Sequence, residues 1–255
     1  ELMAARARVL MDPSVQALRR LQEPPAPREG TPAAQRLAAL YAAALAANRL
    51  RDPTAALQRL QEARALLATL SAAELPALAQ TLALLQAEVL LGAGDARGAL
   101  DQVGALRAAG HVQMLERPLL ALQAHAALLA AAPVREAALR DAAERLQTWV
   151  VAQPQDALGW QLLGDCTQAL GQRLRALRAQ AEARVLLGDL TGAIDRLNSG
   201  RQLVRTGAVA QDFIEVSIIE ARWRELQARR RALLAEREGR SGERAPDRDP
   251  DDARP

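Results

Sequence analysis

Lysine is absent from the sequence, and aromatic residues and cysteine are scarce. The 33 basic residues are all arginine, 2% of the residues are aromatic, and Cys166 is the one cysteine. A single cysteine excludes an intrachain disulfide, and we expect Cys166 to be a small buried apolar residue. Because few aromatic side chains are available to fill a core, packing falls to Leu, Ala and Val, which favours thin layers of helix on helix.

A strong charge excess and long hydrophobic runs are also missing. The formal net charge is +3, with 33 basic and 30 acidic residues interspersed, which gives little support for nucleic-acid binding. No apolar run approaches the roughly 18 residues of a membrane span. We therefore predict neither nucleic-acid binding nor membrane insertion. Glu1 opens neither a signal peptide nor a chain with an initiating Met, so we expect the sequence to be cut from something longer.

The stretch at residues 156–203 carries a repeat signature. Trp160, Leu163 and Gly164 have the spacing W-x2-L-G, and Ala176 and Ala183 follow where a tetratricopeptide repeat requires small residues. In such a repeat, large side chains fill the gap between two antiparallel helices, and small ones let the backbones approach. The pattern therefore predicts a helix-turn-helix array that recruits partners.

An internal repeat supports this prediction. AEVLLGAGDARGALDQV, which begins at Ala87, can be laid over AEARVLLGDLTGAIDRL, which begins at Ala181. In both segments Gly-Asp is followed by Gly-Ala, then Leu or Ile, then Asp. Gly171 and Gly188 are placed to end helices in the left-handed conformation.

We predict an all-α fold, a tetratricopeptide-like helical-hairpin solenoid with a long C-terminal capping helix. No segment shows the alternation of a β-strand. Residues 1–32 form a helical segment with a Pro-rich linker, 33–235 the repeat domain, and 236–255 a disordered charged tail. The expected helices are 34–50, 54–69, 72–91, 96–108, 114–131, 134–152, 156–170, 173–187 and 190–204, then a helix capped by Asp212, with N-caps at Asp52 and in a capping box at 71–74.

The sequence contains few of the residue types that catalytic and metal sites usually need. His111 and His125 are the two histidines, and neither stands in an HExxH zinc motif. We expect His125 to be a packing histidine on its helix and His111 to lie in a connection. Cys166 has no histidine at helical spacing, and no Gly-rich phosphate loop is present. We therefore predict that this chain alone is non-catalytic, with no catalytic residue, metal or cofactor of its own.

The sequence resembles the C-terminal repeat region of M48-family zinc metallopeptidases, and within them the periplasmic type that assists outer-membrane β-barrel assembly. The resemblance is strongest over residues 156–226. It is carried by WQLL (160–163), ALRA (176–179), AE (181–182), GDL (188–190), GAID (192–195) and ARWREL (221–226), and by the opening ELMAARARVLMDP.

That resemblance implies a periplasmic zinc metalloprotease parent, with the zinc in a peptidase domain that is missing here. The partners would be that peptidase domain in cis, the outer-membrane assembly machinery and unfolded clients. The repeat also departs from the consensus, because Thr167, Gln180 and Gly188 stand where Tyr, a large apolar residue and Pro are usual. Its superhelix is therefore expected to be irregular.

The first helix of each pair should line a concave partner-binding surface. Extrapolation from the usual inward positions of the repeat gives Tyr41, Asn48, Arg49, Glu88, Gln161, Asp165, Gln168, Arg175 and Arg178. Charge reversal at Arg178 or Asp165 is expected to weaken partner capture without unfolding the chain.

Two alternatives remain open at this point. One is a free-standing adaptor of the same fold without a peptidase. The other is an RNA-associated helical array that acts through ARRRALLAERE at residues 228–238, although acids interleave there and no aromatic residue accompanies the arginines.

Overall fold

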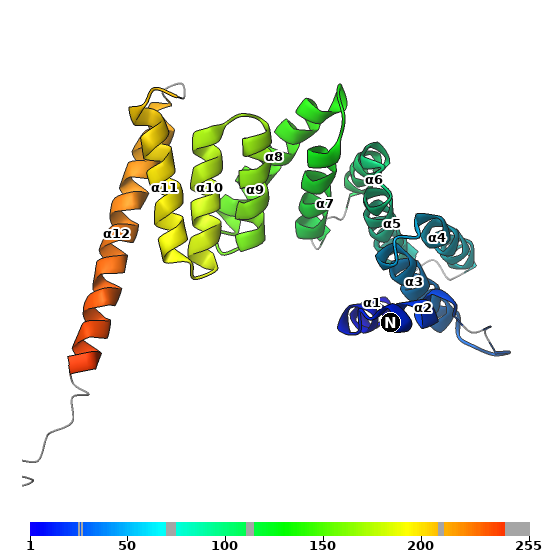
Figure 1. Ribbon diagram of the computed structural model, residues 1–255. Helices are drawn as coiled ribbons and strands as arrows, with labels where there is room; N and C mark the ends of the chain where they lie inside the picture. The colour runs from blue at the N-terminus through cyan, green and yellow to red at the C-terminus, as the bar shows by residue number, and fades with distance from the viewer. Residues whose placement is uncertain (25, 27, 70–74, 111–114, 209–211, 243–255) are drawn as a thin grey trace, which may run out of the picture. The chain divides into compact units, whose positions relative to one another are not determined.

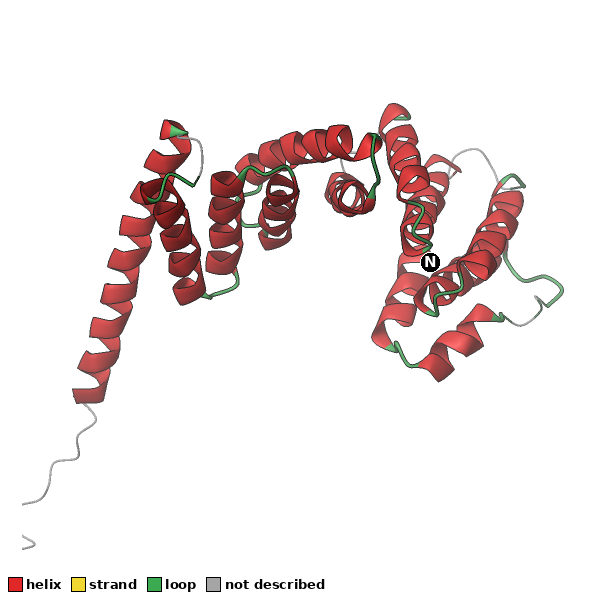
Figure 2. Ribbon diagram, turned by 45° about the horizontal axis from the view of Figure 1, so that its top comes forward, coloured by secondary structure: helices red, strands yellow, loops and turns green. Residues whose placement is uncertain are grey.

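The structure is a computed structural model that describes residues 1–24, 26, 28–69, 75–110, 115–208 and 212–242, without the side chains of 75 and 237–242. Throughout these ranges the secondary structure is helical, and no strand is present (Figure 2). The predicted all-α fold class, built of helical hairpins, is confirmed.

The helices follow the predicted order closely (Figure 1). Predicted and observed ends mostly differ by three residues or fewer. The main exception is the last helix, which runs past the predicted tail boundary at 236. The helices are α1 (Leu2–Met11), α2 (Val15–Gln22), α3 (Ala33–Arg49), α4 (Pro53–Leu67), α5 (Leu75–Gly92), α6 (Ala96–Ala108), α7 (Glu116–Leu129), α8 (Val134–Ala152), α9 (Ala157–Ala169), α10 (Arg173–Leu186), α11 (Leu190–Arg205) and α12 (Phe213–Gly242). The predicted capping box at 71–74, His111 and the tail from 243 lie outside the described residues.

Local backbone chemistry explains where the helices begin and end. Aspartate side chains at the N-caps accept hydrogen bonds from backbone N–H groups of the first turn. Glycines with positive φ end the preceding helices. Asp95 and Asp189 each accept from a glycine N–H at 2.8 Å, and the preceding glycines, Gly94 and Gly188, both have φ of 82°. The internal repeat read from the sequence is thus repeated in the structure at α5–α6 and α10–α11.

The chain divides into two compact units, unit 1 (Glu1–Thr148) and unit 2 (Trp149–Pro255). The division falls within α8 and differs from the predicted one, which gave a single repeat domain over 33–235. Helices α1 and α2 both pack against α3, so the N-terminal segment is part of unit 1.

Unit 1 is built around α3. Its residues 41–47, YAAALAA, are all buried, which means that the helix is covered on every side. Helices α1, α2, α4 and α5 pack around it. Because five of these seven residues are alanine, neighbouring backbones can approach closely without a large side chain between them.

Unit 2 is built around α10, which lies between α9 and α11 (Figure 1). A Cβ at Gly164 on α9 would lie 3.4 Å from the Ala176 carbonyl oxygen, so the close approach predicted at this pair is present. Trp160 is only half-buried, and its indole N–H donates to the Pro154 carbonyl at 3.0 Å. It therefore packs at the α8–α9 connection and fills less of the gap between helices than its motif suggested.

Helix α12 seals unit 2 along one stripe, as predicted. Ile219 and Leu226 are 1% exposed, and Val216 and Trp223 pack beside them. The guanidinium of Arg201 on α11 lies 3.8 Å from the Trp223 ring centroid, a cation–π contact that fastens α12 to its neighbour.

Two glycine-to-alanine substitutions test the close approach of α9 and α10. A Cβ at Gly104, on α6, would meet nothing within 4 Å, whereas one at Gly164 would lie 3.0 Å from Gln180 Cγ. Alanine is favoured over glycine inside a helix by about 1 kcal/mol. In urea unfolding followed by circular dichroism, Gly104→Ala should gain about that much stability and Gly164→Ala should lose most or all of the gain. Equal gains would contradict the contact.

The thiol of Cys166 should be inert in the folded protein. The side chain is buried, and burial, followed by the charge of Asp165, raises the pKa of the thiol to about 12. Because the thiolate is the reactive form, Ellman's reagent at about pH 8 should label the urea-unfolded chain, whose thiol pKa is about 8.5, and leave the folded chain unlabelled. Rapid stoichiometric labelling of the folded protein would show that α9 is not packed as described.

Candidate functional site

A cleft of about 410 Å³ opens in unit 2 beside α10. It lies between the end of α9, the start of α10 and the second half of α11. Polar and apolar residues both line it: Gln168, Arg173, Leu177, Asn198, Ser199, Gln202 and Leu203. The polar residues of α11 reach it together because 198, 199 and 202 share one face of that helix.

The cleft presents carboxamide groups to solvent. Gln168 and Gln202 are exposed, and neither side chain makes a hydrogen bond within the described part of the chain. A carboxamide both donates and accepts, so it can pair with the N–H and C=O groups of an extended polypeptide. Leu177 and Leu203 add apolar contact, and Arg173 adds a positive charge. These groups suit a peptide segment of mixed polarity.

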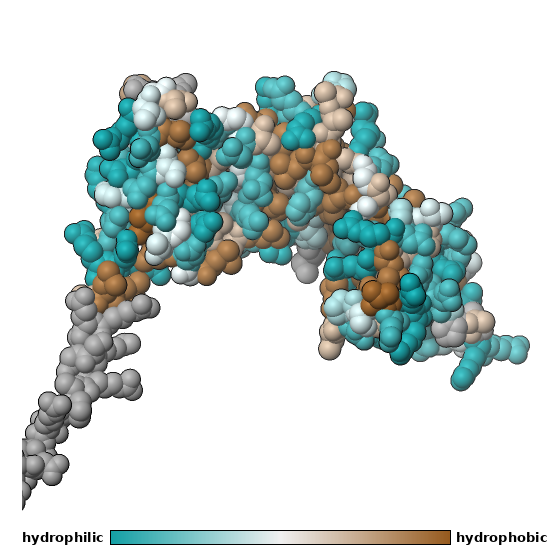
Figure 3. All heavy atoms as spheres, in the orientation of Figure 1, coloured by the Kyte–Doolittle hydropathy of each residue, from teal (hydrophilic) through white to brown (hydrophobic). Residues whose placement is uncertain are grey.

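A second cleft, of about 530 Å³, adjoins the first at the beginning of α10. Arg173 lines both clefts, and Gln172, Arg175 and Asp212 line the second. On the face drawn in Figure 3, hydrophilic residues surround the apolar streaks over α9 to α12. The surface of unit 2 is therefore mixed in character.

The five groove residues predicted in unit 2 do not act alike. Gln161 and Gln168 are exposed, and Gln168 lines the first cleft. Asp165 is half-buried and interacts with other groups of the chain. Arg175 lines the second cleft, where its Nη1 donates to Gln172 Oε1 at 3.0 Å.

Arg178 belongs to the packing of α12. Its Nη2 donates to Glu215 Oε1 at 3.1 Å, and its Nε lies 2.9 Å from Oε2. The two side chains are 16% and 9% exposed. Charge reversal at Arg178 would disturb this pair, so we now expect it to affect folding as well, contrary to the expectation from the sequence. The sequence did not reveal the contact because Glu215 lies far along the chain.

Two of the four predicted groove residues of unit 1, Tyr41 and Glu88, contact Arg6 of α1. Tyr41 is 1% exposed, so it cannot itself offer a partner-binding surface while α1 is docked. Its hydroxyl accepts a hydrogen bond from Arg6 Nη1 at 3.1 Å, and Arg6 Nη2 also donates to Glu88 Oε1 at 2.8 Å. Burial lowers the pKa of Arg6, but the hydrogen bond and charge of Glu88 outweigh that effect and raise it.

The other two predicted residues of unit 1 lie at the end of α3. Asn48 is half-buried against α5, where a Cβ at Gly92 would lie 2.5 Å from its Oδ1. Arg49 is exposed. Asn48 thus packs between helices, whereas Arg49 is open to solvent.

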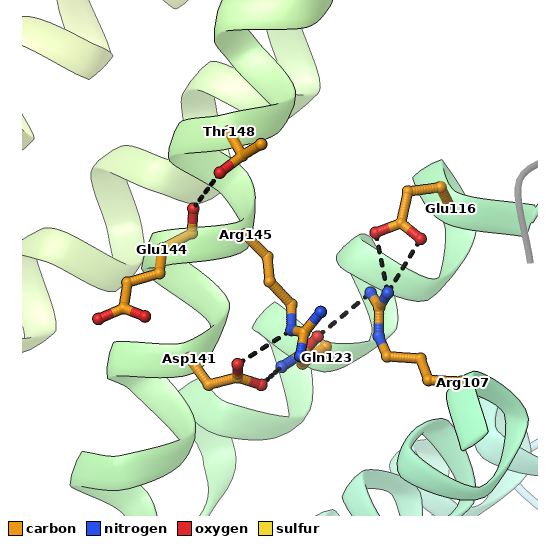
Figure 4. A network of polar contacts seen from close by, with 7 residues as sticks. All are labelled: Arg107, Glu116, Gln123, Asp141, Glu144, Arg145 and Thr148. Carbon is orange, nitrogen blue, oxygen red and sulfur yellow. Dashed lines mark hydrogen bonds and ion pairs between the residues drawn. The ribbon is translucent and has the colours of Figure 1, made fainter.

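A polar network joins α6, α7 and α8 in unit 1 (Figure 4). Arg107 donates to both oxygens of Glu116 at 2.9 Å and to Gln123 at 3.4 Å. Gln123, 5% exposed, donates to Asp141, which also accepts from Arg145 at 2.9 Å. These pairs connect three consecutive helices, so the network holds the helices together.

In the described part of the chain, no group of three or more His, Cys, Asp or Glu side chains is placed to hold a metal ion. The zinc that the resemblance implies belongs to a peptidase domain and not to these residues, so it stays a prediction. His125 is exposed on α7, so its predicted packing role is wrong. The buried residues of that helix are Leu119, Leu120, Leu122, Gln123, Ala124, Ala126 and Ala127. Among the described helices, none is long and apolar enough to cross a membrane.

Comparison with known proteins assigns no family. No family model matches the chain, and no curated protein matches it.

Sequence reasoning missed Arg6, Asn198, Ser199 and Gln202. The polar residues at i, i+1 and i+4 in α11 were a visible signal for one helix face. Arg6 stands inside the apolar segment LMAARARVL, where an arginine on the buried side needs an acidic partner. The sequence does not show what the polar face of α11 lies against, nor which acidic residue pairs with Arg6.

Arg178→Glu should destabilise unit 2, because it places two carboxylates together in a mostly buried site. Breaking such a pair costs about 3 kcal/mol. Unfolding followed by tryptophan fluorescence measures this unit, since Trp149, Trp160 and Trp223 all lie in it.

The matched control is Arg175→Glu, whose Nε is 3.8 Å from Glu215 and whose side chain is 39% exposed, so its loss should be smaller. Combining Arg178→Glu with Glu215→Arg should restore stability. An unchanged midpoint for Arg178→Glu alone would remove the pair from the account of α12 docking.

Proposed function

We propose that the chain is a protein-binding repeat domain that recruits substrates or partners for an M48-type periplasmic metalloprotease of outer-membrane protein quality control. The observation that carries the binding role is the cleft in unit 2, which is lined by the exposed carboxamides of Gln168 and Gln202 together with Leu177 and Leu203. The peptidase parent and the periplasm rest on the sequence resemblance at residues 156–226.

The clients that best fit this cleft are unfolded outer-membrane β-barrel segments. Their strands alternate apolar and polar side chains. While unfolded, they also have main-chain N–H and C=O groups that are not yet paired with a neighbouring strand. Gln168 and Gln202 would bind that main chain, and the two leucines would contact every second side chain.

Removal of both carboxamides should weaken client binding. We expect Gln168→Ala/Gln202→Ala to bind a fluorescently labelled, urea-denatured porin at least about ten-fold more weakly on dilution, because two hydrogen bonds of about 1 kcal/mol each are lost. Fluorescence anisotropy measures the affinity.

The control is Gln161→Ala, which removes an exposed carboxamide from α9 outside the cleft. It should bind like the wild type. Full affinity in the double variant, or an equal loss in the control, would contradict the cleft as the binding site. The parent is tested separately: the full-length native product should carry HExxH and bind zinc, and a product without that motif would favour the free-standing adaptor.

A further inference from the structure

Helix α1 lies on unit 1 through a narrow face that combines three apolar residues and one arginine. The apolar residues, buried at helical spacing, are Leu2, Ala5 and Val9. Arg6 lies on the same face, and its guanidinium donates to Tyr41 on α3 and to both carboxylate oxygens of Glu88 on α5, at 2.8 and 3.2 Å. A single side chain thus connects α1 to two helices of the unit.

Glu88 occupies a position of the internal repeat that pairs with an arginine in both units. When the two segments are aligned, Glu88 falls opposite Glu182 on α10. Glu182 accepts two hydrogen bonds from Arg222 of α12, at 2.9 and 2.7 Å. In the same register Leu128 on α7 stands opposite Arg222. The position on α7 is thus apolar, and Glu88 pairs with an arginine of α1, a helix outside the hairpin series.

The contacts of α1 are those of an exchangeable helix. Only three of its side chains are buried, while Met3, Leu10 and Met11 are 59%, 42% and 85% exposed. The helix has 10 residues, and a helix this short is marginal in water without a surface to pack on. Its connection to α2, residues 12–14, is exposed.

We propose that the face of α3 and α5 around Tyr41 and Glu88 is a binding site for an arginine-bearing helix of a partner protein, and that α1 occupies this site in cis. The partner helix carries aliphatic or small residues four and one positions before its arginine and three positions after it, as α1 does. Its arginine replaces Arg6 between the tyrosine hydroxyl and the carboxylate. This proposal rests on the proposed protein-binding function. The helix-binding site lies in unit 1 and the cleft lies in unit 2, and they share no residue. Experiments can therefore disprove one site without disproving the other.

The test uses the full chain and a labelled peptide of residues 1–13, ELMAARARVLMDP. In the Arg6→Glu chain, α1 faces Glu88 with a like charge and should leave the site. Fluorescence anisotropy should then show that this chain binds the peptide at least ten-fold more tightly than the wild-type chain, whose site is occupied. The Glu88→Arg chain should bind a peptide that carries Arg6→Glu in preference to the wild-type peptide.

Arg8→Glu is the matched control, because Arg8 is exposed on the same helix and should give no gain in peptide binding. Circular dichroism checks that each variant is folded, and the neutral Arg6→Gln variant replaces Arg6→Glu if that chain unfolds. A folded Arg6 variant with no gain in peptide affinity overturns the proposal, as does an equal gain in Arg8→Glu. Loss of porin binding in the cleft variants does not bear on this result.

Discussion

Close packing against two alanine-rich helices is the constraint on which both units depend. In unit 1, residues 41–47 of α3 are buried on every side. In unit 2, α10 buries Ala176, Ala179, Ala181 and Ala183 between its neighbours. Alanine allows helix backbones to approach and costs no side-chain entropy, so a chain with few aromatic residues can still bury a core in each unit.

Apolar packing of this kind does not by itself decide which helix docks where, because alanine faces resemble one another. Arginine–carboxylate pairs between specific helices determine which helix packs at each position. At the shared repeat position, Glu88 holds Arg6 and Glu182 holds Arg222. In the same register Arg107 falls opposite Arg201, and each reaches a glutamate on the next helix, Glu116 and Glu220. The absence of lysine fits this use, since the forked guanidinium binds a carboxylate with defined geometry.

Sequence reasoning predicted the helices and their ends well because their signals are local. Asp95 and Gly94, for example, fix a turn within a few residues. The surfaces were predicted less well, because they depend on contacts between distant segments. Tyr41 was assigned to a groove, but α1 covers it, and Arg178 was assigned to the same groove, but it holds Glu215. His125 is a further example, because it is exposed. The Ala- and Leu-rich sequence around it indicates a helix that packs in the core but does not indicate which face of that helix is covered.

Native-state amide hydrogen exchange tests the central role of α3 and α10 most directly. Amides exchange slowly where opening disrupts the most packing. The slowest amides should therefore lie in residues 41–47 of unit 1 and 176–183 of unit 2, and the exposed residues 228–236 of α12 should exchange fast. Exchange at 41–47 and 176–183 as rapid as in that end of α12 would contradict the account.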